Sequence, residues 1–261
     1  MKCTSTLLLL MAYLIILISP AYAQRSDPNF HLYLLIGQSN MAGRGKTDAV
    51  RKPVNERILM LDSTGQFVPA TDPVHFDKKE AGVGPAISFA ENMLPANRKI
   101  KIGLIPAAVG GTSIQLWVPA AYDSVTHTHP YDDAMMRVKE AMKYGVLKGI
   151  LWHQGEANSG NFQDSPGYIA LLRELIQRIR TVANMPQLPV TIGEIGYFRP
   201  AFMNFNAMLK AVPDSIPFTN VVSAQGLQHK GDHTHFNTES ARELGKRFAE
   251  GMKTLQQRNG K

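Results

Sequence analysis

The chain has 261 residues, a length typical of one large domain or two small ones. Apolar residues make up 44% of it and charged residues 19%, with 21 Gly and 16 Pro, which excludes a disordered, collagen-like or coiled-coil protein. The net charge of +7 is compatible with nucleic acid, an anionic glycan or a cell envelope as partner, whereas the single cysteine excludes intrachain disulfides and thiolate-rich metal sites.

The first residues predict export. Lys2 precedes an uninterrupted apolar run of 12 residues, 7–18, and Ser19-Pro20 end this run ahead of Ala21-Tyr22-Ala23, an A-x-A cleavage pattern. The run is shorter than the roughly 18 apolar residues that cross a bilayer. We therefore expect a signal peptide over residues 1–23 and a secreted or periplasmic protein without membrane contact after cleavage, an uncleaved anchor being the alternative.

Removing 23 of the 261 residues leaves 238, with no cysteine and a charge of +6 because only Lys2 is lost. Export weakens the case for a nucleic-acid partner, and the basic residues are scattered rather than clustered with aromatic residues as on a nucleic-acid-binding face. We expect no nucleic-acid partner; the sequence does not predict an oligomeric state.

Beyond the signal peptide, short apolar runs bounded by Gly or Pro alternate with segments of helical period. The runs predict strands at residues 31–37, 57–61, 100–106, 149–153, 190–193 and 219–223. The periodic segments predict helices at 84–94, 131–144, 166–182, 201–211 and 238–255. This alternation predicts one doubly wound α/β domain over residues 24–261, with active-site residues at the carboxyl ends of the strands. The irregular stretches 43–51, 66–81 and 117–129 are expected to shape a substrate surface.

The turn after the first predicted strand carries Ser39. A phosphate-binding loop needs Gly where Asn40 stands, and a dinucleotide fingerprint needs a third Gly where Asp48 stands. The nucleophile elbow G-x-S-x-G is matched up to its last position, where Met41 replaces Gly. Ser39 is thus a candidate nucleophile, with a helix N-cap as the alternative.

Two further strand ends offer hydrogen-bond donors. The paired glycines 110–111 follow strand 100–106, and the backbone N–H of Gly111 can approach a substrate oxygen, although such a pair is also common in tight turns. Gln154 follows strand 149–153 with a carboxamide, next to His153 and close to Glu156. Taken alone, Gln154 could equally be a surface loop residue.

The segment before the last helix holds Asp232 and His235 three residues apart. This spacing allows the carboxylate to approach the imidazole and orient it as the base for a serine nucleophile, with Glu156 as a rival acid. His229, His233 and His235 also permit a metal site, but histidines two apart point to opposite sides of an extended chain, so no metal and no other cofactor is expected.

The two tryptophans are possible platforms for a sugar ring. Trp152 ends a predicted strand and is expected in the core, whereas Trp117 lies in a loop and is the better candidate for stacking on a pyranose face.

Four blocks occur in an order that resembles carbohydrate esterases of family six. They are Gly-Gln-Ser-Asn-Met (37–41), Gly-Gly-Thr-Ser (110–113), Trp-His-Gln-Gly-Glu (152–156) and Asp-His-Thr-His (232–235). This group is related to the sialate O-acetylesterase-like domain of the SGNH-hydrolase superfamily, and the likeness spans about residues 31–252. It implies a flavodoxin-like, three-layer α/β/α fold and a metal-independent esterase that removes acetyl groups from sugars, typically xylan.

The resemblance also assigns roles to residues. Ser39 resembles the nucleophile, His235 the base and Asp232 the acid, and an oxyanion hole is implied from the backbone N–H groups of Ser39 and Gly111 with the side chain of Gln154. Many relatives carry Asn where Gln154 stands, and the exchange preserves a carboxamide donor. The expected function is an acetylxylan-esterase-like serine esterase acting on an acetylated oligo- or polysaccharide. A sialate O-acetylesterase, a non-catalytic carbohydrate-binding domain and a metal-dependent deacetylase remain alternatives.

Overall fold

A computed structural model describes residues 26–48, 53, 55–160 and 165–259. The predicted signal peptide and part of the stretch 43–51 lie outside these residues. The described chain contains one seven-stranded sheet with the strand order β3-β2-β4-β1-β5-β6-β7. The strands are β1 (Asp27–Gly37), β2 (Ile58–Leu61), β3 (Phe67–Pro69), β4 (Lys101–Pro106), β5 (Gly145–His153), β6 (Val190–Gly193) and β7 (Thr219–Val222).

Strand β1 forms the centre of the sheet because its run of apolar residues can be buried on both faces. It pairs in parallel with β4 on one side and with β5 on the other, and every residue from 32 to 37 is buried. All other neighbours are also parallel except β3, which pairs antiparallel with β2 at the edge. The carboxyl ends of β1, β4 and β5 therefore meet at one edge, where a doubly wound fold forms its site.

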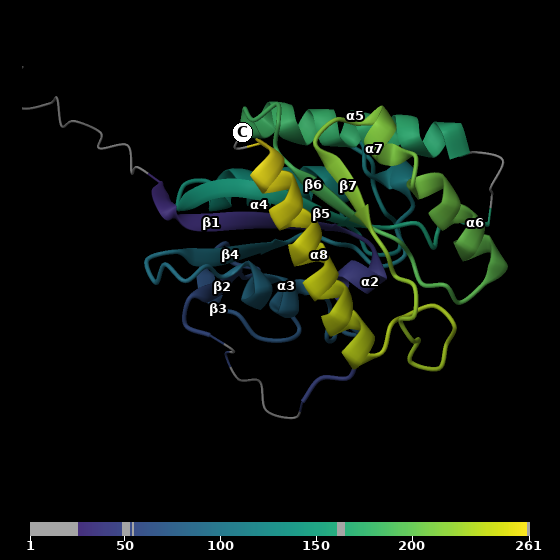
Figure 1. Ribbon diagram of the computed structural model, residues 1–261, viewed down its shortest axis with the longest axis horizontal. Coiled ribbons are helices and arrows are strands. Elements are labelled where there is room, and N and C mark those ends of the chain that lie inside the picture. Colours follow the sequence, from purple (N-terminus) through teal and green to yellow (C-terminus); the bar gives the residue numbers. More distant parts are fainter. Residues whose placement is uncertain (1–25, 49–52, 54, 161–164, 260–261) are drawn as a thin grey trace, which may run out of the picture.

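Helices cover both faces of the sheet, so that the domain has three layers (Figure 1). The helices are α2 (Ser39–Ala42), α3 (Ala86–Met93), α4 (Pro130–Ala141), α5 (Ser165–Ala183), α6 (Pro200–Leu209), α7 (Val212–Ser215) and α8 (Thr238–Asn259), with a 3-10 turn, η1, at Ile114–Leu116. Helices α3 and α8 pack on one face, where β1 contributes Tyr33 and Leu35. Helices α4 and α5 pack on the other face, where β1 contributes Leu32, Leu34 and Ile36. This alternation follows from the two-residue period of a strand.

The predicted fold class is confirmed: the protein is a three-layer α/β/α domain with a mainly parallel sheet. All six predicted strands and all five predicted helices are present, with ends shifted by a few residues. The edge strand β3 was not predicted, because its three residues lie in the stretch 66–81, which has no apolar run. Among the described helices, none is both long and apolar enough to cross a membrane.

Candidate active site

Ser39 lies where the central strand turns into a helix. Gly37 ends β1 with a φ of +130°, and a Cβ there would lie 2.0 Å from the His153 carbonyl oxygen, so only glycine fits this turn. Helix α2 begins at Ser39 itself, its N-cap is Gln38, and no side chain caps it. The N-cap alternative for Ser39 is therefore wrong, and its hydroxyl is available to another partner.

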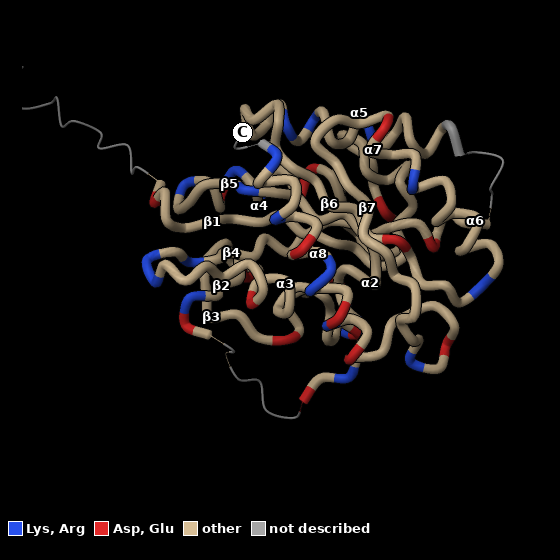
Figure 2. Tube along the Cα trace, viewed as in Figure 1, with Lys and Arg blue, Asp and Glu red and all other residues tan. Residues whose placement is uncertain are grey.

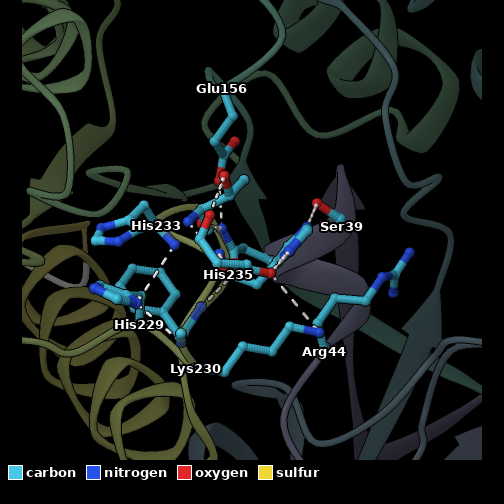
Figure 3. Close-up of polar contacts among 12 residues, drawn as sticks. Ser39, Arg44, Glu156, His229, Lys230, His233 and His235 are labelled. Atoms are coloured by element: carbon cyan, nitrogen blue, oxygen red, sulfur yellow. Dashed lines mark hydrogen bonds and ion pairs between the residues drawn. The ribbon is translucent and has the colours of Figure 1, made fainter.

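That partner is His235. The hydroxyl of Ser39 lies 2.9 Å from His235 Nε2, and His235 Nδ1 lies 2.7 Å from Asp232 Oδ2 (Figure 3). The other oxygen, Asp232 Oδ1, accepts hydrogen bonds from the backbone N–H groups of His235 (2.8 Å) and Thr234 (3.0 Å). The structure thus joins a serine, an imidazole and a carboxylate in the order that activates a nucleophile, across 196 residues of sequence.

The surroundings suit His235 as a base. Burial lowers the pKa of His235, and this effect exceeds the opposing influence of Asp232, so the imidazole is neutral at pH 7. Burial alone would raise the pKa of Asp232, but the hydrogen bonds from His235 and Thr234 outweigh it and lower that pKa to about 2. The carboxylate therefore stays ionised and holds a proton on Nδ1, which leaves Nε2 to accept the Ser39 proton.

Two backbone donors lie in the turns that follow β1 and β4. The backbone N–H groups of Ser39 and Gly111 have no hydrogen-bond partner among the residues that the structure describes. Gly111 has a φ of +90° and follows the carboxyl end of β4. Val109, two residues earlier, donates its N–H to the Gly37 carbonyl (2.9 Å), which ties this turn to the turn that carries Ser39. Both donors are free for an oxyanion.

The structure corrects the predicted role of Gln154 as a third donor. Its side chain is fully buried, and Nε2 donates to Asn158 Oδ1 (2.7 Å), Gln38 Oε1 (3.0 Å) and the Thr112 carbonyl (3.2 Å). Two amide hydrogens already shared among three acceptors leave none for a substrate oxygen. Gln154 instead connects the turns that carry Ser39 and Gly111.

Glu156 does not contact His235. Its Oε1 accepts a hydrogen bond from Asn40 Nδ2, and its Oε2 is buried without a partner (Figure 3). Burial raises the pKa of Glu156 to about 7. Of the two candidate acids, Asp232 is the one placed to orient His235.

Asn40 is a residue whose role the sequence did not reveal. Besides bonding Glu156, its Nδ2 donates to the Thr234 carbonyl (3.0 Å), and its Oδ1 accepts from the Phe236 N–H (3.1 Å). Asn40 thus forms hydrogen bonds with the backbone of both residues that flank His235. The only sequence signal for this role was the place of Asn40 in the block 37–41. That place does not show where its side chain points.

The prediction that Trp117 stacks on a sugar is wrong. Trp117 is 1% exposed, because the turn η1 directs it inward, where it packs edge-to-face on Trp152 and donates Nε1–H to Thr112 Oγ1 (3.2 Å). Trp152 lies in the core as predicted, and its Nε1–H donates a hydrogen bond to Tyr168 Oη (3.0 Å). His153 is fully buried too, with its pKa lowered to about 4 by burial.

The histidines of the metal alternative have other contacts. The rings of His229 and His233 contact each other at a tilt of 39°, with centroids 4.1 Å apart, and His229 Nδ1 accepts a hydrogen bond from the Gly231 N–H (2.9 Å). In the described part of the chain, no three or more His, Cys, Asp or Glu side chains are grouped to hold a metal ion.

Two cations lie at the edge of the site. A Cβ built on Gly111 would lie 3.9 Å from Lys78 Nζ, so this ammonium group lies near that residue. Lys230 Nζ lies 3.8 Å from Asp232 Oδ2. The charge of Lys230 is thus partly balanced by Asp232, whereas Lys78 has no ion pair among the described residues.

Comparisons with known proteins agree with this geometry. Residues 29–254 match the family of carbohydrate esterases described as sialic acid-specific acetylesterases. A protein of Arabidopsis thaliana named a probable carbohydrate esterase is 31% identical over 253 residues, which is 87% of this chain and 92% of the relative.

Solved structures show the same architecture. An Arabidopsis thaliana protein at 28% identity superposes with a TM-score of 0.76, covering 87% of this chain and 99% of that one. NanS, at 17% identity, superposes with a TM-score of 0.66 over 89% of this chain and 99% of that one, a likeness of fold. The family that the four sequence blocks resemble is thereby confirmed. With its serine, histidine and aspartate aligned, this chain belongs to the carbohydrate esterase family of sialic acid-specific acetylesterases and is a carboxylic ester hydrolase, a carbohydrate acetylesterase.

Proposed function

We propose that this protein is a serine esterase that removes O-acetyl groups from sugars through an acetyl-Ser39 intermediate. The hydrogen-bonded series Ser39–His235–Asp232 is the observation that carries this proposal. The free N–H groups of Ser39 and Gly111 support it, because they can hold the negative oxygen of a tetrahedral intermediate.

The reaction follows two half-steps. Ser39 Oγ bonds to the acetyl carbonyl carbon while His235 Nε2 takes the hydroxyl proton. The bond between this carbon and the sugar oxygen then breaks, and His235 returns the proton to that oxygen. Water next attacks the acetyl-Ser39 carbonyl carbon and gives its proton to His235. The bond between this carbon and Ser39 Oγ then breaks, His235 returns the proton to Oγ, and acetate and free Ser39 result.

Removal of the nucleophile tests the reaction. Ser39→Ala should abolish acetate release from acetylated sugars and also labelling by a fluorophosphonate, which the intact protein should take up at Ser39. Circular dichroism checks that the variant is folded. Full activity in folded Ser39→Ala would refute the mechanism, and a protein that neither releases acetate nor takes the label would support the non-catalytic alternative.

The charge of the sugar is a second question. The acetylxylan preference implied by the sequence resemblance concerns a neutral sugar, whereas Lys78 near Gly111, which has no ion pair among the described residues, favours an anionic one. We propose that the better substrate is an acetylated sugar acid such as an O-acetylated sialic acid, with its carboxylate near Lys78.

The two substrates can be compared directly. Lys78→Ala should lower kcat/KM for an O-acetylated sialic acid roughly three- to fivefold, as expected of a partly exposed charge pair worth up to about 1 kcal/mol, and should leave acetylated xylo-oligosaccharides unaffected. Lys79→Ala is the matched control, because its side chain is 93% exposed and its only ion pair among the described residues is a 4.0 Å contact with its neighbour Glu80. A higher kcat/KM for the xylo-oligosaccharides in the intact protein would restore the acetylxylan assignment.

We also propose that this hydrolysis takes place outside the cytoplasm, in the periplasm or the medium. The support is the charged, apolar and A-x-A pattern of residues 1–23. Fractionation of the expressing cells, with N-terminal sequencing of the active form, would test it. A mature protein that begins before residue 24 in the cytoplasmic fraction would contradict it.

A further inference from the structure

The turn that carries Gly111 is held by a buried ion pair. The backbone N–H of Gly110 donates to Asp77 Oδ2 (2.8 Å), and Arg44 Nη2 donates to the same oxygen (3.0 Å). The Arg44 and Asp77 side chains are only 7% and 2% exposed. A bond from a backbone N–H to a buried carboxylate is among the stronger hydrogen bonds in proteins.

The pair lies directly against the turn. A Cβ on Gly110 would be 2.3 Å from Arg44 Nη2 and 2.9 Å from Asp77 Oδ2, so glycine is required for the guanidinium and carboxylate to reach the backbone. The backbone N–H of the next residue, Gly111, has no hydrogen-bond partner among the described residues. The contact thus acts one peptide unit away from an oxyanion donor.

The same pair reaches back to the nucleophile. Arg44 Nη1 donates to the Gly43 carbonyl (2.7 Å), and the Gly43 N–H donates to the Ser39 carbonyl (2.9 Å). Arg44 and Ser39 are both labelled in Figure 3, and no contact is drawn between them. Arg44 follows helix α2, which begins at Ser39, whereas Asp77 lies in the loop after β3 and Gly110 in the loop after β4. The ion pair thus connects three separate loops.

Keeping the pair buried is costly. Asp77 Oδ1 is buried without a hydrogen-bond partner, and such an orphaned oxygen destabilises a fold. Replacement of a buried ion pair by apolar residues is often neutral or stabilising, so stability alone does not explain these two charges. The hydrogen bonds of Arg44 to the Gly43 carbonyl and of Asp77 to the Gly110 N–H give a reason for the two buried charges.

We propose that Arg44 and Asp77 are positioning residues that fix the Gly110–Gly111 turn, so that the Gly111 N–H points at the oxyanion formed on Ser39. This inference rests on the proposed function of Ser39. In this proposal, the side chains of Arg44 and Asp77 do not touch the substrate. Their effect passes through the backbone of Gly110 and should appear in the chemical step rather than in sugar binding.

The test compares two substitutions of one residue. Asp77→Ala removes the acceptor for the Gly110 N–H, and kcat should fall about 10- to 100-fold with KM nearly unchanged, up to the loss seen when one oxyanion donor is removed. Asp77→Asn keeps an oxygen acceptor and should recover most of this kcat. If the role of Asp77 were purely structural, both variants would have a lower melting temperature, and kcat would not fall selectively while KM stayed constant.

Asp72→Ala is the matched control. Asp72 lies in the same loop and pairs with Arg242 (2.6 Å), but it has no contact with Gly110, so its loss should leave kcat within about twofold. Equal kcat losses in folded Asp72→Ala and Asp77→Ala, or an unchanged kcat in Asp77→Ala, would overturn the proposal. Either result leaves the role of Ser39 intact, because only activity in Ser39→Ala tests that role.

Discussion

His235 accepts the proton of Ser39 only when its ring is neutral. Because burial lowers its pKa below the ordinary 6.5 in spite of Asp232, the ring should lose its proton below pH 6.5. We expect kcat/KM for acetate release to be constant near pH 7 and to fall with acid, with a midpoint below pH 6.5. A profile measured between pH 4.5 and 8.5 checks this, and an acid midpoint above 6.5 would contradict it.

The two carboxylates near the site should differ sharply in catalysis. Asp232→Asn removes the charge that holds the His235 tautomer, and kcat should fall by roughly 10³- to 10⁴-fold, as in other serine triads. Glu156→Gln keeps an oxygen for Asn40 and should cost far less, because Glu156 has no contact with His235. If Glu156→Gln shows the larger loss in kcat, the carboxylate assignment is wrong.

Glu156 should also make stability depend on pH. Its pKa of about 7 in the folded chain exceeds its ordinary value of 4.5, so between these pH values the folded chain keeps a proton that the unfolded chain has lost. The stabilisation from protonated Glu156 is complete below about pH 4.5 and is lost as the pH rises through 7.

Urea unfolding at pH 5 and pH 8 tests this titration. The free energy of unfolding of the wild type, measured relative to Glu156→Gln, should drop by about 1–3 kcal/mol from pH 5 to pH 8, since a pKa difference of one corresponds to about 1.4 kcal/mol. The comparison with Glu156→Gln cancels the contribution of the other titrating groups. A difference that stays constant with pH would show that Glu156 does not titrate in this range.

At the scale of elements, α3 and α8 approach each other through a glycine. A Cβ on Gly245 of α8 would lie 2.3 Å from the Pro85 carbonyl oxygen and 2.9 Å from the Phe89 nitrogen. Gly245→Ala should therefore lower the free energy of unfolding by about 1–3 kcal/mol, in spite of the higher helix propensity of alanine.

The control lies at the next position of the same helix. Lys246 has a side chain that is 55% exposed, and Lys246→Ala should change stability by no more than about 0.5 kcal/mol. Chemical denaturation of both variants makes the comparison. An unchanged stability in Gly245→Ala would mean that the two helices can separate at little cost.

The helices that the sequence predicted are those with a long periodic pattern, and the predicted strands are those that form an apolar run. Strand Val190–Gly193 has its predicted bounds, and all four of its residues are buried. The short helices α2, η1 and α7 were missed because three or four residues show no helical period, and β3 was missed because it has only three residues. Trp117 was misjudged for the same reason, since the turn η1 decides where it points.

At the scale of the whole molecule, the charge excess of +7 is dispersed. Among the described residues, blue and red positions are interspersed along the trace in the view of Figure 2. Remote basic residues should thus contribute little to the binding of an anionic sugar, because interactions beyond about 10 Å are screened at 0.1 M salt. Lys101 begins β4, at the edge of the sheet opposite the site.

We expect Lys101→Ala to leave kcat/KM for an O-acetylated sialic acid unchanged at 0.1 M salt, although it lowers the net charge by one, as Lys78→Ala does. Parallel kinetics of the two variants separate local from global charge. Equal losses of kcat/KM in both would show that net charge, rather than the position of Lys78, governs substrate capture.

The sequence by itself determined the fold class and the candidate residues of the triad, with the acid left open between Asp232 and Glu156. Apolar runs that alternate with amphipathic segments favour a parallel sheet between helices, and the turns at Ser39 and Gly111 follow the carboxyl ends of its strands. Only the tertiary structure decided which polar atoms meet. Gln154 and Asp232 both offer suitable groups in sequence, but Gln154 is occupied by neighbours 42 and 116 residues away, while Asp232 bonds His235 within its own turn. Hydrogen bonding depends on direction and on distances of about 3 Å, and such contacts between distant segments arise only when the sheet has brought its strand ends together.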